Sequence, residues 1–204
     1  AAKEVWGLGA GRSSSDCAFD HNIQAEFERM RGGAAVTVVV DLWKCFETVS
    51  PHIVMQEAQE LGFPLRLAWL LLQCYAQPRI LRAFEGVSHE VVSFQGTIAG
   101  CSHATTILSV LLTGALRKAA WRDATVIPRS LVDDVTLQWR GQVGPGVQAL
   151  AQTARMFFAD LQELKAHVQM DKLAFVSTSR AAAQAFKLFA RRLRIPHRRW
   201  ARNL

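Results

Sequence analysis

The chain has 204 residues, of which 50% are hydrophobic and 20% are charged. This length and balance suit one globular domain with a core and exclude a disordered chain. Charged residues interrupt every apolar run before about 18 residues, so the sequence predicts no membrane span and no membrane partner. Its first residues, AAKEV, lack the apolar stretch of a secretory signal and contain no Met, and we expect the chain to be part of a longer protein.

The net charge of +7 lies at the C-terminal end of the chain. Residues 180–204 hold eight basic and no acidic side chains, whereas residues 1–179 hold 16 basic and 17 acidic ones. A cluster of Arg beside Trp200 can bind phosphates and stack on bases, as nucleic-acid-binding segments do. A solvated helix face is an equally common role for such a run of charge.

Four cysteines are scattered along the chain, and none belongs to a CxxC pair. Their spacing predicts neither a zinc site nor a disulfide framework and suits a reducing, intracellular compartment. We expect these side chains to act as small buried hydrophobic residues. The cysteines are Cys17, Cys45, Cys74 and Cys101.

The first half of the chain predicts both helices and strands. Three serines followed by Asp16 provide a hydroxyl cap and an acid for the first turn of a helix. The apolar residues that then recur at helical spacing are Ala18 or Phe19, Ile23, Phe27 and Met30. The run 34–40 is apolar and β-branched, as in a strand buried on both faces, and it ends on Asp41. The expected elements are a helix from 13–16 to Gly32, a strand at 34–40, helices at 50–61 and 64–76, and a hairpin at 79–94.

The second half begins with a flexible loop at 96–100. The elements expected after it are a helix at 102–118, strands at 125–132 and 135–139, a helix at 144–168, a strand at 173–177 and a helix at 181–193. This order of elements predicts an α+β domain with a mainly antiparallel sheet and helices packed on one face.

Three carboxylates form the pattern that carries chemistry. Asp41 ends a buried strand, and Asp133 and Asp134 lie at the tip of a tight hairpin far along the chain. If the strands are neighbours, the carboxylates meet at one sheet edge and repel one another unless a cation neutralises them. Hard oxygen ligands select Mg²⁺, and two such ions can catalyse nucleotidyl transfer. An isolated Asp-Asp turn is usually structural, but the joint pattern is much less common.

Residues 38–49, VVVDLWKCFETV, resemble motif A of the reverse transcriptases of non-LTR retroelements. Further segments resemble the family's other motifs, in the family's order and over nearly the whole chain. They are 7–16 (GLGAGRSSSD) for the segment before motif A, 96–102 (GTIAGCS) for motif B, 131–137 (LVDDVTL) for motif C, Lys172 for motif D and 202–204 (RNL) for the start of motif E. The sequence departs from the family at Ala99, where motif B usually has Gln.

The resemblance implies a right-handed polymerase palm with part of the fingers, acting as an RNA-directed DNA polymerase. Its partners would be an RNA template, a DNA primer and dNTPs, and its cofactors two Mg²⁺ ions, for which Mn²⁺ can substitute. The domain organisation implied is a palm with partial fingers over 1–179, followed by a basic helix and extension over 180–204 that leads towards a thumb. A eukaryotic element would place the protein in the nucleus.

The resemblance also implies roles for particular residues. The metal ligands would be Asp41, Asp133, Asp134 and the backbone of Leu42. Phe46 would lie under the incoming sugar and exclude a 2′-hydroxyl, and Lys172 would protonate or neutralise the leaving pyrophosphate. The residues implied to bind the nucleotide are Leu42, Trp43, Lys44, Cys45, Phe46, Ala99 and Gly100. Nucleic-acid contacts are expected at Arg12, Arg191, Arg192, Arg198 and Arg199.

Two other functions are compatible with the residues. One is an inactive remnant of a retroelement that only binds nucleic acid through its basic end. The other is a metal-dependent phosphohydrolase that uses the same carboxylates, although Phe46 and the motif B glycines have no role in it. We expect the 204-residue chain by itself to polymerise weakly or not at all, because the thumb that would grip the duplex is not part of it.

Overall fold

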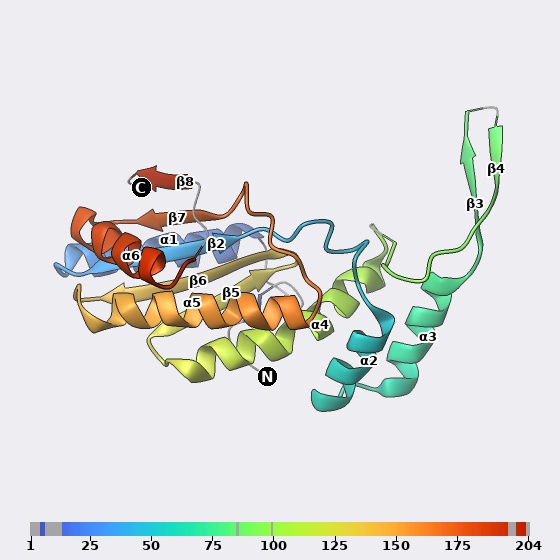
Figure 1. The fold of residues 1–204 in the computed structure, drawn as a ribbon, viewed down its shortest axis with the longest axis horizontal. Coiled ribbons are helices and arrows are strands. Elements are labelled where there is room, and N and C mark those ends of the chain that lie inside the picture. The colour runs from blue at the N-terminus through green and yellow to red at the C-terminus, as the bar shows by residue number, and fades with distance from the viewer. Residues whose placement is uncertain (1–4, 7–13, 85, 99, 196–198, 203–204) are drawn as a thin grey trace.

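Figure 1 shows the fold in a computed structural model, which describes residues 5–6, 14–84, 86–98, 100–195 and 199–202. The described helices are α1 (Ser14–Met30), α2 (Pro51–Glu60), α3 (Leu65–Ala76), α4 (Ser102–Arg122), α5 (Pro145–Glu163) and α6 (Arg180–Arg192). The described strands are β1 (Val5–Trp6), β2 (Ala34–Val40), β3 (Arg79–Ala83), β4 (Gly86–Val91), β5 (Val126–Leu131), β6 (Asp134–Gly141), β7 (Ala174–Ser177) and β8 (Arg199–Arg202).

A six-stranded sheet in the order β1-β5-β6-β2-β7-β8 forms the centre of the molecule. The four inner strands are antiparallel, and the short outer strands β1 and β8 pair in parallel with their neighbours. The predicted α+β class with a mainly antiparallel sheet is therefore confirmed. The strands β1 and β8 were not predicted, because strands of two and four residues give almost no periodic signal.

One face of the sheet packs against α4, α5 and α6 to form the hydrophobic core (Figure 1). Val36, Val38 and Val40 of β2 point to this face and are at most 1% exposed. The helices are joined to one another by an ion pair in which the Arg122 guanidinium donates to both carboxylate oxygens of Asp160, at 2.5 and 2.9 Å. This pair links the last turn of α4 to α5 and explains why α4 continues to Arg122, beyond the predicted end at 118.

Helix α5 ends at Glu163, five residues before the predicted end, without a glycine. Lys165 adopts a φ of +56°, in the left-handed region. The N–H of Lys165 donates to the carbonyl of Gln162, and the N–H of Ala166 donates to that of Leu161. This is the Schellman arrangement that normally uses glycine, so the sequence carries no visible stop signal here.

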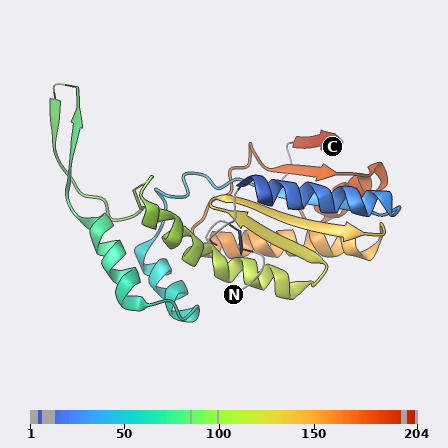
Figure 2. The same ribbon diagram turned by 180° about the vertical axis from the view of Figure 1, so that it is seen from behind.

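Helix α1 lies on the opposite face of the sheet (Figure 2), so the helices are not confined to one face as the sequence predicted. This face is mixed, because the buried polar Thr37 and Gln138 share it with Ala35 and Val39. The buried polar groups need hydrogen-bonding partners. Helix α1 supplies them with polar side chains and also turns Ala25 toward the sheet.

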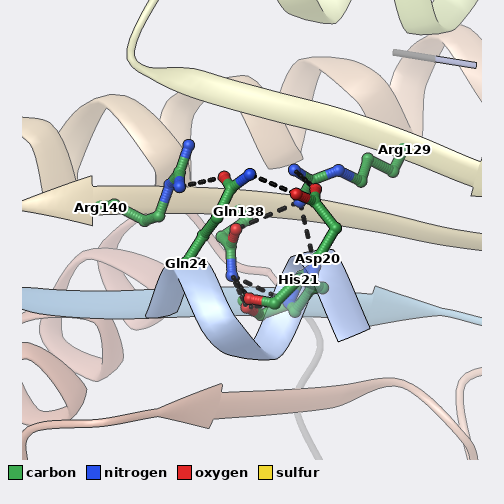
Figure 3. A network of polar contacts seen from close by, with 7 residues as sticks. Asp20, His21, Gln24, Arg129, Gln138 and Arg140 are labelled. Carbon is green, nitrogen blue, oxygen red and sulfur yellow. Dashed lines mark hydrogen bonds and ion pairs between the residues drawn. The ribbon is translucent and has the colours of Figure 1, made fainter. Parts of the chain in front are cut away.

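A network of hydrogen bonds and ion pairs joins α1 to this face (Figure 3). Arg129, of which 7% of the side chain is exposed, pairs with Asp20 at 2.7 Å and approaches Nδ1 of His21 at 3.3 Å. Nε2 of His21 lies 2.9 Å from the Thr37 hydroxyl, and the fully buried Gln138 donates to the His21 carbonyl. Further contacts join Arg140 to Gln24 and Gln24 to Asp20.

Helices α2 and α3 and the hairpin β3–β4 form an arm that projects from the sheet (Figure 1). The hairpin is a separate two-stranded sheet, and its side chains are largely exposed. None of the described helices combines the length and apolar character that a membrane span requires.

We expect His21 to make stability depend on pH. Burial, and then the charges of Arg129 and Arg140, lower its pKa from 6.5 to about 4. The unfolded chain therefore binds more protons between these values, and stability is lost as pH falls through this window. Protonation of His21 should lower the free energy of unfolding by about 2–3 kcal/mol across this pH range. Urea unfolding at a series of pH values measures this loss.

The matched comparison is between His21→Gln and His52→Gln, since His52 is exposed. His21→Gln should flatten the pH dependence of stability between pH 6.5 and about 4, whereas His52→Gln should leave it as in the wild type. Identical slopes in the wild type and His21→Gln would contradict the assignment.

Candidate active site

The register between β2 and β6 brings the predicted carboxylates together. Val40, the last residue of β2, has Val135 as its partner across the antiparallel ladder. Asp41 follows Val40 and Asp134 precedes Val135, so the two acids lie side by side at the same end of neighbouring strands. Asp133 belongs to the two-residue turn that joins β5 to β6, beside the Leu131–Asp134 pair. The structure thus brings Asp41 together with two acids, Asp133 and Asp134, from far along the chain.

Lys172 reaches this cluster through a short antiparallel contact outside the main sheet. Leu42 forms a bridge with Val168, the N–H of Trp43 donates to the His167 carbonyl at 2.7 Å, and the N–H of Gln169 donates to the Asp41 carbonyl at 2.8 Å. These contacts hold the segment before β7 against the end of β2. As a result Nζ of Lys172 lies 3.0 Å from Oδ2 of Asp41.

The carboxylates act on one another electrostatically. Burial raises the pKa of Asp134, the charges of Asp133 and Asp41 raise it further, and Lys172 opposes them. About a quarter of the Asp41 side chain is exposed, so the cluster is open to a ligand from solvent. Within the described residues, no three His, Cys, Asp or Glu side chains converge closely enough to hold a metal ion as a preformed group. The cation that now faces Asp41 is the ammonium of Lys172.

Cys45 connects the loop after β2 to Asp133. Its side chain is 6% exposed, and burial followed by the charge and hydrogen bonding of Asp133 raises the thiol pKa to about 12. The thiol therefore stays protonated and donates its hydrogen toward the carboxylate. The predicted interior position of Cys45 is confirmed, and its implied contact with a nucleotide stays a prediction.

The loop after β2 is fixed to the predicted motif B loop by backbone hydrogen bonds. The N–H of Gly96 donates to the Val49 carbonyl and that of Thr97 to the Phe46 carbonyl, each at 2.7 Å. Gly96 has a φ of +85°, and a Cβ there would lie 2.7 Å from the carbonyl oxygen of Glu47. Only glycine adopts this φ without strain and has no Cβ to collide with the Glu47 carbonyl. Phe46 itself is half-buried and packs against the core.

The remaining residues that were predicted to bind the nucleotide differ in their exposure and in whether their backbone N–H groups are already bonded. Leu42 is buried, whereas Trp43 and Lys44 are exposed and stack, with Nζ of Lys44 5.1 Å from the Trp43 ring. Because the Trp43 N–H is already bonded to His167, this N–H is not free for a triphosphate. Gly100 is exposed with a φ of +85°. Ala99 lies outside the described residues.

The predicted nucleic-acid-binding residues are only partly described. Arg191 and Arg192 are exposed in the last turn of α6, an element that contributes none of the three carboxylates. The backbone of Arg199 belongs to β8, which pairs with β7. Arg12 and Arg198 lie outside the described residues.

Sequence analysis missed a polar group at the start of α4. Cys101 is the N-cap of α4 and is partly exposed, contrary to its predicted role as a buried hydrophobic residue. The Tyr75 hydroxyl donates to its sulfur at 3.3 Å, and this bond, followed by contacts with His103, lowers the thiol pKa to about 7. Tyr75 lies on α3, so no local pattern reveals the contact. Cys74 is also exposed, which is a second exception to the prediction.

We expect two variants to move the pKa of Asp134 in opposite directions. Asp41→Asn removes a like charge and should lower it, whereas Lys172→Met removes a neighbouring cation and should raise it. Carboxyl ¹³C NMR titration measures both shifts. Glu90→Gln, on the exposed hairpin, is the control and should change nothing. Shifts of the same sign in the two site variants would contradict this cluster.

Gly96→Ala should destabilise the domain by about 2–4 kcal/mol, because it combines left-handed strain with a clash against Glu47. Gly100→Ala is the matched control, since Gly100 has the same φ of +85° but open space around its Cβ position. It should cost about 1–2 kcal/mol from strain alone. Chemical denaturation gives both values, and equal losses would show that the Glu47 contact is not rigid.

Two solved structures have a fold similar to that of this chain. No protein-family model matches the chain, and no curated protein does. Among solved structures, it is similar to apo telomerase from Candida tropicalis truncated from its C-terminal domain, with a TM-score of 0.58 and 13% identity over 85% of this chain. It is also similar to telomerase from Candida albicans in complex with a fragment of telomeric RNA, with a TM-score of 0.51 and 14% identity over 82% of this chain.

The chain spans about a third of those two telomerase chains, 36% and 30% respectively. At this identity the likeness concerns the fold. It agrees with the predicted palm-like arrangement of an antiparallel sheet and helices.

Proposed function

We propose that this chain is the palm, with part of the fingers, of an RNA-directed DNA polymerase from a non-LTR retroelement. The observation that carries the proposal is the meeting of Asp41 and Asp134 across the β2–β6 ladder, with Asp133 and Lys172 beside them. The sequence motifs indicate a non-LTR retroelement, and the telomerase-like fold supports nucleotidyl transfer as the class of reaction.

The donor set at this edge suits two Mg²⁺ ions. Carboxylate oxygens are the ligands that Mg²⁺ prefers, and the pKa of Asp134 is raised first by burial and then by the charges of Asp133 and Asp41, which a cation would offset. Asp41, Asp133, Asp134 and the carbonyl of Leu42 would hold the ions. When bound, they supply charge neutralisation for the attacking 3′-hydroxyl and the leaving pyrophosphate.

The chain's own side chains would orient the reactants. Lys172, whose Nζ lies 3.0 Å from Asp41, would hold or donate a proton at Nζ near the leaving pyrophosphate. Phe46 is anchored by the Thr97 N–H and by core packing, so its ring has little freedom to yield to a 2′-hydroxyl. This rigidity supports its role in selecting dNTPs over ribonucleotides.

The partners proposed are an RNA template and a DNA primer. The similar Candida albicans structure holds a fragment of telomeric RNA, which supports RNA as a ligand for this type of domain. In the proposed division, residues 1–179 form the palm and partial fingers, and 180–204 lead from it towards a thumb. The exposed Arg191 and Arg192 would bind phosphates nonspecifically.

Two rival functions remain distinguishable. An inactive remnant would bind nucleic acid without extending it, and a phosphohydrolase would hydrolyse nucleotides without a template. The closely constrained Gly96–Glu47 contact favours the polymerase, because it holds the motif A and motif B loops together, an arrangement for which a hydrolase has no use.

The decisive variant is Asp133→Asn. We expect the wild-type chain at low salt and in excess over a primer on an RNA template to add single dNTPs, and the variant to add none. Because the chain by itself should grip the duplex weakly, Mn²⁺ binding followed by electron paramagnetic resonance gives a second readout. The variant should bind Mn²⁺ about tenfold or more weakly.

The control is Glu163→Gln, at the exposed end of α5, which should match the wild type in both assays. Nucleic-acid binding by a wild type that binds no Mn²⁺ would identify the remnant, and template-independent release of phosphate would identify the hydrolase. Extension that survives Asp133→Asn would contradict the proposed site.

A further inference from the structure

A cavity of about 280 Å³ lies between helix α1 and the face of the sheet opposite the hydrophobic core. Ala18 and Ala25 line it from α1, where they lie seven residues apart on the same side of the helix. Ala35 and Val39 of β2 and Val176 of β7 line it from the sheet. These small side chains leave a space whose volume is near the lower limit for small-molecule sites.

Several polar side chains of the lining are already paired within the protein. Nε2 of His21 lies 2.9 Å from the Thr37 hydroxyl, and Arg129 pairs with Asp20 at 2.7 Å. Figure 3 shows the contacts of His21 and Arg129 between α1 and the sheet. The Thr178 hydroxyl accepts a hydrogen bond from a backbone N–H of β2 at 2.9 Å. These groups do not need a ligand, and the alanines and valines beside them favour one with an apolar body.

Charge enters the cavity at the end that adjoins the candidate active site, where Asp134 lines it. Arg129, the other residue of the lining with a full charge at neutral pH, is balanced by its ion pair. Burial raises the pKa of Asp134, the charges of Asp133 and Asp41 raise it further, and Lys172 opposes them. Acids therefore outnumber bases at this end of the cavity, which favours a positively charged group there.

An anionic ligand suits this lining poorly, although Arg129 belongs to it. The Arg129 side chain is 7% exposed, and its guanidinium also lies 3.3 Å from Nδ1 of His21 and 3.3 Å from Oε1 of Gln138. An anion would have to displace the Asp20 carboxylate from this guanidinium and leave it unpaired, which is costly. It would also share the cavity with the carboxylate of Asp134.

We propose that this cavity binds a small aromatic amine, with its ring between α1 and the valines of β2 and β7 and its ammonium group against the Asp134 carboxylate. A flat, rigid ring buries a large apolar area and loses little freedom on binding, which suits a space bounded by a helix and a sheet. The ammonium adds a charge-assisted hydrogen bond at the end where the acids gather. For a ligand of one or two rings, the expected dissociation constant is on the order of 0.1–1 mM.

Three compounds that share an indole ring test the class of ligand: tryptamine is a cation, indole is neutral and indole-3-acetate is an anion. NMR titration of the ¹⁵N-labelled 204-residue chain gives each dissociation constant. No metal is added, so the result does not depend on the proposed polymerase activity. Tryptamine should bind about threefold or more tightly than indole, and indole-3-acetate should bind more weakly than either. Asp134→Asn should reduce the affinity for tryptamine to that for indole, whereas Glu163→Gln, at the exposed end of α5, should leave it unchanged.

Filling the cavity tests where the ligand binds. Ala25→Phe places a ring in the space and should weaken the binding of tryptamine and indole by about tenfold or more. Ala181→Phe is the matched control, because Ala181 is an exposed alanine of α6, and it should bind both compounds as the wild type does. Far-ultraviolet circular dichroism checks that each variant is folded. In the wild type, nuclear Overhauser effects from the indole ring to the methyl groups of Val39 and Val176 locate the ligand without any substitution.

A wild type that binds neither tryptamine nor indole saturably would overturn the proposal. So would an Ala25→Phe variant that binds them as tightly as Ala181→Phe, or a bound indole ring that contacts neither Val39 nor Val176. Binding of indole-3-acetate as tight as that of tryptamine would contradict the preference for a cation at Asp134.

Discussion

The register between β2 and β6 determines the rest of this structure. Seven consecutive residue pairs, from Ala34–Gly141 to Val40–Val135, align the two strands without a bulge. A slip of one residue would turn the core side of one strand to the other face. The same register that buries Val38 against the helices therefore brings Asp41 beside Asp134. Core packing and the position of the carboxylates are consequences of one alignment, so neither can change without the other.

Three acids, Asp41, Asp133 and Asp134, repel one another at one edge of the sheet, and Lys172 is the cation beside them. Asp134 has a raised pKa because of burial and its acidic neighbours, and Lys172 offsets part of that repulsion through Asp41. The short antiparallel contact between Leu42 and Val168 keeps Lys172 in reach without adding a strand to the main sheet.

The two faces of the sheet are built on different physical principles. One buries valines and leucines against α4, α5 and α6, while the other buries Arg129 and Gln138 in a hydrogen-bonded network with α1. Buried polar groups are tolerated only when their partners are in place, so this network fixes the rotation of α1 more strictly than apolar packing would. As a consequence, Phe19, Ile23, Phe27 and Met30 of α1 are exposed.

The sequence by itself predicted the helices, the inner strands and the carboxylates of the candidate site, because these depend on local periodicity and on residues close in the chain. The run 34–40 predicted β2 with the correct ends, and the acids at 41 and 133–134 were recognised as a pair of motifs. Tertiary structure alone decided which way α1 faces, since its apolar positions indicate a core side until the buried polar groups of the sheet are known. It also decided that Lys172 pairs with Asp41 and that Tyr75 bonds to Cys101. These contacts join residues on separate elements, and their energy depends on distances that only the folded chain defines.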